Sequence, residues 1–294
     1  MQILKEEVRI FMSDIAIVTD STAYIPQDLR EQYDITMVPL NVIFGETVFK
    51  EEDLTTETFY EKMREADELP TTSQPSIGLF EETFHQLGQE HDEIIVITLS
   101  SGISGTYQTA VAAGNMTDNV NVHVFDSEVS CMVQGFFVLA AAKMVRKGLE
   151  SQAILAQLES MKKKSRAYFM ADDLSHLHRG GRLNGAQLVV GSLLQIKPVL
   201  HFDNKVIVPY EKVRTAKKAL AKIFSLLDND AKDGAALDIV VIHANRPEKA
   251  EEIAAELKGK YPATNVHFSY FGPVIGTHLG EGSIGIGWVE TKYK

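Results

Sequence analysis

Three stretches decide the fold class of this 294-residue chain: DIAIVTD (residues 14–20), EIIVITL (93–99) and VNVHVFD (120–126). Each is a short run rich in β-branched residues, and small or polar residues follow it, which is typical of buried strands in a parallel sheet. Between the first two, apolar residues recur at the spacing of a helix. We therefore expect residues 14–160 to form an α/β domain with a parallel, doubly wound sheet.

The pattern changes after residue 160. Residues 199–202 and 205–209 flank Asp203-Asn204, which suits a tight turn, so this pair predicts an antiparallel hairpin. Helices expected near 214–227 and 247–259 alternate with further strands. Those strands are predicted at residues 167–171, 238–243, 265–270 and 284–290. Residues 161–294 are therefore expected to form a second α/β domain around a mixed sheet.

Composition narrows the classes of function. The 40 acidic and 29 basic residues give a formal charge of -11, which is unfavourable for binding the phosphate backbone of a nucleic acid. We expect a soluble protein, because no apolar run approaches the roughly 18 residues of a spanning helix. Cys131 is the only cysteine, so it reads as a core residue of a protein in the reducing cytoplasm. Residues 1–13 lack the order of a signal peptide and are predicted to be an extension, with Met12 a plausible alternative start.

A serine-rich segment, LSSGISGT (residues 99–106), stands where a predicted strand ends and a helix begins. Ligands of open α/β sheets bind at such strand ends, and the free N–H groups of a helix start favour an anion. One serine, Ser101 or Ser104, would suffice to cap the helix. The additional hydroxyls indicate an anion site.

Two other segments carry candidate polar contacts. PTTSQPS (residues 70–76) is expected to be a polar loop whose hydroxyls, Thr72 among them, could close over an oxyanion. His278 is expected in a glycine-rich turn, where a ligand can approach the backbone. The match Gly280-x-Gly282-x-x-Gly285 is discounted as a dinucleotide site, because the chain runs directly into a strand instead of a helix.

Charged and titratable residues between 172 and 182 raise two possibilities, a metal site and an anion site. Asp172, Asp173, His176 and His178 do not have convincing metal-ligand spacing, so no metal site is expected. Arg179 and Arg182 bracket a Gly-Gly turn, where guanidinium groups either grip a carboxylate or phosphate or pin the turn to nearby carbonyls.

A serine hydrolase is the main rival from another class of function. Ser104 would be the nucleophile at the strand-to-helix turn, but Thr106 stands where the Gly-x-Ser-x-Gly motif needs its last glycine. Asp126 and His278 exist as potential triad members, although nothing in their spacing places them together.

Several motifs in order, from Ile15 to nearly the end of the chain, resemble the DegV family, the fatty-acid-binding subunits of bacterial fatty acid kinase. The motifs are VTDST (18–22), TSQPS (72–76), SSGISGTY (100–107), DS (126–127), RGGR (179–182), KP (197–198) and GTH (276–278). The resemblance implies a two-domain DegV-like fold. It also implies that Thr72, Ser104 and His278, and less directly Arg179, contact a fatty acid carboxylate.

The resemblance further implies a function in phospholipid metabolism. The protein would bury a long-chain fatty acid in a tunnel and present its carboxylate to a separate dihydroxyacetone-kinase-like kinase subunit, which makes the acyl phosphate from ATP. It would then have no catalytic residues, no cofactor and no ATP site of its own, in agreement with the absence of a Gly-x-x-x-x-Gly-Lys-Ser/Thr loop from the sequence. Transient contact with a membrane is left open, and a nucleotide-dependent enzyme is a third alternative.

Two departures from the family pattern bear on how the acyl chain is bound more than on how the head group is bound. Met132 stands where many members have glycine, and Glu281 where the family often has proline. Met132 could reshape a nearby apolar tunnel, so the preferred chain length and saturation stay open.

Overall fold

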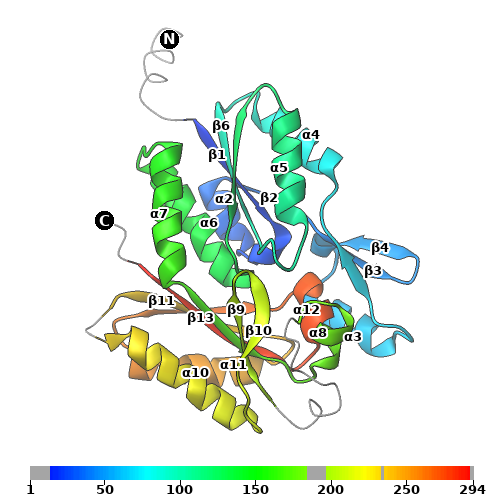
Figure 1. Ribbon diagram of the computed structural model, residues 1–294, viewed down its shortest axis with the longest axis vertical. Coiled ribbons are helices and arrows are strands. Elements are labelled where there is room, and N and C mark those ends of the chain that lie inside the picture. The colour runs from blue at the N-terminus through cyan, green and yellow to red at the C-terminus, as the bar shows by residue number, and fades with distance from the viewer. Residues whose placement is uncertain (1–13, 184–196, 233–234, 292–294) are drawn as a thin grey trace.

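The computed structural model describes residues 14–183, 197–232 and 235–291 (Figure 1). The predicted extension, residues 1–13, lies outside the described residues. Among those residues, no helix combines the length and apolar character needed to cross a membrane.

The first sheet is parallel, as predicted, with strand order β2-β1-β6-β7. Its strands are β1 (Ile15–Asp20), β2 (Ile35–Val38), β6 (Glu93–Thr98) and β7 (Asn121–Asp126). Alternate residues of a strand point to opposite faces. Ala16 and Val18 pack against α4 (Ile77–Leu87) and α5 (Thr106–Met116), whereas Ile15 and Ile17 pack in the cluster that contains α6 (Cys131–Arg146). Helices thus cover both faces, and the doubly wound prediction is confirmed.

The second sheet is mixed, also as predicted, with order β10-β9-β8-β13-β11-β12. Its strands are β8 (Arg166–Met170), β9 (Val199–Asp203), β10 (Val206–Glu211), β11 (Leu237–His243), β12 (Asn265–Tyr270) and β13 (Ile284–Glu290). Helices α10 (Ala216–Asp230) and α11 (Pro247–Lys260) pack on one face. On the other face lie α6 and α7 (Ser151–Lys164), which separate this sheet from the first (Figure 1).

The predicted β9–β10 hairpin is present and antiparallel. Asn204 and Lys205 adopt positive φ angles of 47° and 73° at its turn. That conformation matches the twist of paired strands, and asparagine tolerates it better than most residues.

A third, small sheet was not predicted. It has order β4-β3-β5 and consists of β3 (Asn41–Phe44), β4 (Thr47–Lys50) and β5 (Thr71–Ser73). The expected loop at residues 70–76 was therefore wrong in part, because Thr71 to Ser73 pair with β3. Three polar residues carry too little pattern to predict a strand, and here the partner strand decides the conformation.

The glycine-rich turn expected around His278 is instead a helix, α12 (Pro273–Leu279). Proline fits the first helical position, where no N–H is needed. Gly276 is unfavourable in a helix but is required by packing, since a Cβ there would lie 2.6 Å from the Tyr60 hydroxyl. Tertiary contact therefore overrides the local pattern.

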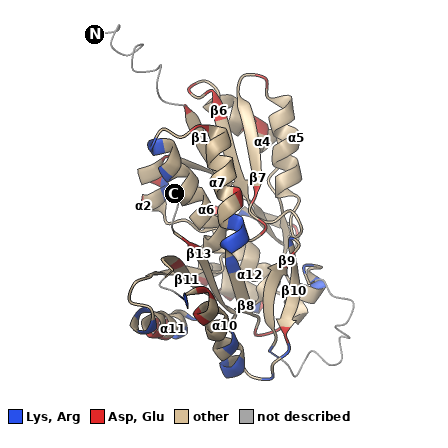
Figure 2. Cartoon of the chain, turned by 60° about the vertical axis from the view of Figure 1, so that its left-hand side comes forward, with Lys and Arg blue, Asp and Glu red and all other residues tan. Residues whose placement is uncertain are grey.

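The remaining helices are short and lie in the first two hundred residues. They are the 3-10 helices η2 (Ser21–Ala23) and η3 (Glu51–Asp53) and the α-helices α2 (Gln27–Tyr33), α3 (Thr56–Glu65) and α8 (Ser175–Arg179). The proposed domain boundary near residue 160 falls inside α7, after the last strand of the first sheet and before the first strand of the second. Acidic and basic residues are interspersed along both parts (Figure 2).

Candidate functional site

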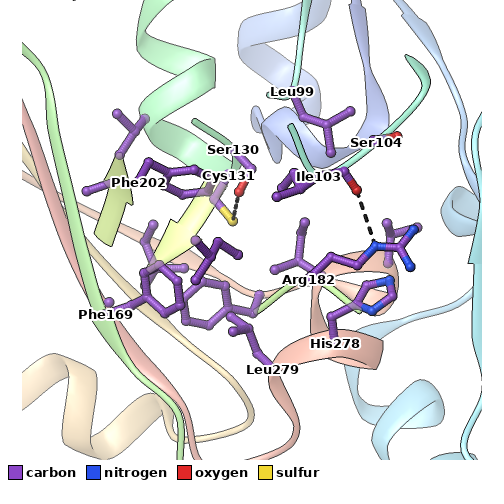
Figure 3. A pocket seen from close by; sticks show the side chains of 18 of the residues that line it. Leu99, Ile103, Ser104, Ser130, Cys131, Phe169, Arg182, Phe202, His278 and Leu279 are labelled. Carbon is purple, nitrogen blue, oxygen red and sulfur yellow. Dashed lines mark hydrogen bonds between the residues drawn. The ribbon is translucent and has the colours of Figure 1, made fainter. Parts of the chain in front are cut away.

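A narrow cavity lies between the two large sheets and brings together three of the four predicted site residues. Twenty-six described residues line it, from β5, α6, β8, β13 and α12 among other segments, yet its volume is only about 70 Å³. The cavity is therefore narrow for the number of residues that line it. Most of its lining is apolar, as in Leu99, Phe169 and Phe202, whereas Arg182, His278 and Ser104 lie on one side of it (Figure 3).

Thr72 lies on β5, where it pairs with Val42 of β3. This register turns its side chain toward α12, and its Oγ1 lies 2.8 Å from Nε2 of His278. Two residues 206 positions apart thus meet at the polar end of the cavity.

His278 is held neutral at this end. Burial, followed by the positive charges of Arg182 and His176, lowers its pKa to about 3. Its Nδ1 is buried and has no hydrogen-bond partner among the described residues. Gly180 packs directly against the ring, since a Cβ there would lie 2.4 Å from Nδ1. The glycine turn therefore allows the close approach of α8 and α12.

Ser104 lies between β6 and α5, as predicted, and lines the same cavity. It is not the N-cap residue of α5, which is Gly105. Its Oγ lies 2.9 Å from Oγ1 of Thr106 and accepts a hydrogen bond from the Thr106 N–H. The hydroxyl is thus oriented at the start of an 11-residue helix, where the dipole favours an anion.

Arg182, rather than Arg179, is the arginine at the cavity. Arg179 is exposed at the end of α8 and does not line it. The chain reverses at Gly181, which has a φ of +68°, and this turn carries Arg182 back toward His278. The family resemblance implied Arg179, whereas the residues alone left both arginines of the turn open, because which one faces inward depends on that reversal.

The Arg182 guanidinium is half-buried and donates to the carbonyl oxygens of Ile103 and Gly180. No carboxylate pairs with it among the residues that the structure describes. Burial lowers its pKa, although an arginine keeps its charge at any physiological pH. The cavity thus presents one unpaired positive charge at its polar end.

The potential hydrolase triad is not assembled. The Asp126 carboxylate contacts Lys205 Nζ at 3.0 Å and accepts from the backbone N–H groups of Ser101 and Glu128. The His278 ring is hydrogen-bonded to the Thr72 hydroxyl, and the Ser104 hydroxyl to that of Thr106. No acid therefore orients the histidine among the described residues.

A second cavity of about 550 Å³ lies between η2, η3 and the ends of β11 and β12, and it shares no lining residue with the first. Its buried carboxylates, Asp20 and Glu51, are already hydrogen-bonded to protein groups. Among the described residues, no cluster of three histidines, cysteines or acids could hold a metal ion. The narrow cavity is the better candidate site.

Comparison with known proteins agrees with this architecture. The model of the DegV family, described as uncharacterised, matches residues 14–291. The protein DegV of Bacillus subtilis is 56% identical over 277 residues, which cover 94% of this chain and 99% of that protein. This chain belongs to the DegV family.

Solved structures of DegV proteins share the fold. The crystal structure of B. subtilis DegV, a fatty acid binding protein, covers 95% of this chain and 100% of its own at 54% identity, with a TM-score of 0.91. A fatty acid binding DegV family protein from Streptococcus agalactiae is 32% identical and covers 95% of this chain and 99% of its own, with a TM-score of 0.87. The predicted family and α/β fold are therefore confirmed.

Proposed function

We propose that this DegV-family protein binds a long-chain fatty acid in the narrow cavity, with the carboxylate at the end formed by Thr72, Ser104, Arg182 and His278. The observation that carries the proposal is the distribution of polarity in the cavity. One narrow, mostly apolar space ends at an unpaired guanidinium and two hydroxyls. The fatty acid binding described for the B. subtilis and S. agalactiae relatives supports it.

The energetics of this arrangement favour a fatty acid over a smaller anion. Burying each methylene gains roughly 0.8 kcal/mol, so about 14 methylenes offer on the order of 11 kcal/mol before ordering costs. A carboxylate buried with them must be paired, because an unpaired buried charge is strongly unfavourable. Arg182 can pair with that charge, and Ser104 and Thr72 can donate hydrogen bonds to it.

The protein would present the carboxylate and carry out no chemistry itself. A separate ATP-dependent kinase, similar to dihydroxyacetone kinase, would phosphorylate the bound head group in the cytoplasm. Arg179 is exposed and precedes Gly180, which packs against the His278 ring, so this arginine is available to such a partner. ATP binding by the isolated chain would contradict this division of labour.

The first test is mass spectrometry of organic extracts from the natively purified protein. We expect stoichiometric fatty acid of 14 to 18 carbons, with the free fatty acids of the host as reference. A protein that arrives empty and also refuses added oleate and palmitate would overturn the proposal.

The second test addresses the head-group site. The double variant Thr72→Ala/Ser104→Ala should lose about tenfold or more in affinity for oleate, because each lost hydrogen bond to a charge contributes more than 1 kcal/mol. Thr71→Ala/Ser101→Ala is the matched control, since these neighbours have the same chemistry but do not line the cavity. Undiminished affinity in the first variant would remove this site.

The hydrolase alternative makes a different prediction. Labelling of Ser104 by a fluorophosphonate probe, with ester turnover that Ser104→Ala abolishes, would support it. We expect no labelling, because His278 is hydrogen-bonded to Thr72 and is not oriented by an acid.

A further inference from the structure

Glu51 is a buried carboxylate that the head-group site does not use. It is 5% exposed, and none of the ion pairs among the described residues includes it. Acidic side chains are rarely buried without a partner. Glu51 instead accepts three hydrogen bonds: from Ser21 Oγ, from the Tyr24 hydroxyl at 2.8 Å and from the backbone N–H of Val274 at 2.8 Å.

The bond to Val274 connects the two parts of the molecule. Val274 lies in the first turn of α12, whose N-cap residue, Gly272, has no side chain to accept from the free N–H groups of that turn. Glu51 accepts from one of these groups, and the Tyr24 hydroxyl accepts from the next, that of Ile275, at 3.3 Å. Residues from the beginning of the chain thus cap a helix near its end.

The carboxylate is itself rigidly held. Ser21 Oγ accepts from the Leu40 N–H at 3.1 Å, and the Glu51 N–H donates to the Leu40 carbonyl at 2.9 Å. Ser21 follows Asp20, whose side chain accepts from Thr22 and from the Leu99 N–H. The Asp20-Ser21-Thr22 motif, which makes no contact with the fatty acid cavity, therefore builds the support for Glu51.

Helix α12 is consequently fixed at both ends by the first part of the chain. Its start is held by Glu51 and Tyr24, and its end carries His278, which is bonded to Thr72. The helix has only seven residues, so a shift at its start is transmitted to His278. The Glu51 carboxyl thus accepts from a free N–H group at the start of this helix.

We propose that Glu51 is a positioning residue for the fatty acid head group: by capping α12 from the first domain, it sets the place and orientation of His278. This inference rests on the proposed function. It assigns a role in ligand binding to a residue that touches no ligand.

The test compares three variants of the full chain by oleate titration and by NMR of the His278 imidazole in fatty-acid-free protein. Glu51→Ala should weaken oleate binding about tenfold and move the imidazole signals, because three buried donors, the Val274 N–H and the Ser21 and Tyr24 hydroxyls, lose their acceptor. Glu51→Gln keeps an amide oxygen for Val274 and should recover affinity to within about threefold. Glu52→Ala is the matched control, since the neighbouring carboxylate is exposed and makes no such bond.

The two readouts separate this inference from the proposed function. Wild-type protein that binds no oleate would contradict the proposed function. The imidazole signals would still report whether Glu51 positions His278. A folded Glu51→Ala protein with unchanged affinity and unchanged imidazole signals would overturn the inference, even if it were less stable. If Glu51→Ala does not fold, Glu51→Asp takes its place, because the shorter side chain moves the carboxyl away from the Val274 N–H. Unchanged affinity and unchanged imidazole signals in that variant would overturn the inference.

Discussion

At the scale of single residues, the candidate site combines a positive charge that has no carboxylate partner with a histidine that is held neutral. Arg182 is a half-buried cation without a carboxylate among the described residues, and His278 is kept neutral by burial and by neighbouring positive charge. A ligand carboxylate would satisfy the arginine and remove the unfavourable field at the histidine. The site is thus electrostatically prepared for an anion before any arrives.

Replacing Arg182 tests which arginine of the turn binds the head group. Arg182→Gln should lose about 10- to 100-fold in oleate affinity by isothermal titration, because a hydrogen bond to a charged group contributes about 1.5–3 kcal/mol. Arg179→Gln is the matched control and should stay within about twofold, since Arg179 is exposed outside the cavity. The reverse outcome would return the role to Arg179.

Acidification tests the neutral state of His278. Its pKa is about 3 in the folded protein and near 6.5 when unfolded, so protons bind the unfolded chain preferentially and stability falls as the pH drops below 6.5. Between pH 7 and pH 5, the free energy of unfolding should fall in both proteins, but in His278→Gln it should fall by on the order of 2 kcal/mol less than in the wild type. Urea unfolding of fatty-acid-free protein measures both values.

The comparison of His278→Gln with the wild type isolates the contribution of His278. Burial raises the pKa of Glu51 to about 7, which acts in the opposite direction, but this contribution is common to both proteins. His85→Gln, at an exposed position, should lose as much stability as the wild type. An equal loss in His278→Gln would mean that the imidazole is not held neutral.

At the scale of elements, strand β13 forms the cavity wall because it carries glycines where neighbours approach. Gly285 and Gly287 line the cavity on the same face of the strand. A Cβ at Gly287 would lie 2.2 Å from Val133 Cγ2 on α6 and 3.0 Å from the Arg166 carbonyl. Helix α6 can therefore approach β13 this closely only with glycine at this point.

Gly287→Ala should destabilise the protein by about 1–3 kcal/mol through overpacking, as measured by chemical unfolding. Adding Val133→Ala should recover part of that loss, because it removes the nearest contact. Gly78→Ala on α4 is the control: it meets nothing within 4 Å and should be neutral or stabilising by up to about 1 kcal/mol. Equal stability of Gly287→Ala and wild type would show that the layers can separate freely.

At the scale of the whole molecule, the cavity belongs to neither sheet alone. Its lining draws Leu99 and Cys131 from the first part of the chain and Phe169, Ile242 and Leu279 from the second. A ligand in it contacts both parts and binds only when they are together. Fatty acid should therefore stabilise the assembled molecule.

Loading delipidated protein with oleate at about 100 times Kd should add roughly 2.7 kcal/mol of stability, which corresponds to a Tm increase of about 5–10 °C. Differential scanning calorimetry checks this shift. The matched C18 alcohol lacks the charge that pairs with Arg182 and should raise Tm by much less. Equal shifts from the acid and the alcohol would indicate that the polar end does not select a carboxylate.

The sequence by itself determined the parallel first sheet except for strand β2, the six strands of the mixed second sheet, and the family. Runs such as residues 93–99 are long and apolar enough for local pattern to specify their structure, and Ser104 could be placed at a strand-to-helix junction because that position follows from the pattern alone. The predicted division at residue 160 stays a prediction.

Only the tertiary structure decided how the head-group site is assembled. Thr72 lies on a three-residue strand specified by its partner β3, and His278 lies on a helix whose start is capped by Glu51, more than 200 residues earlier. Arg182 faces the cavity because the chain reverses at Gly181. These features depend on contacts between distant segments, and the periodicity of a short local stretch carries no information about such contacts.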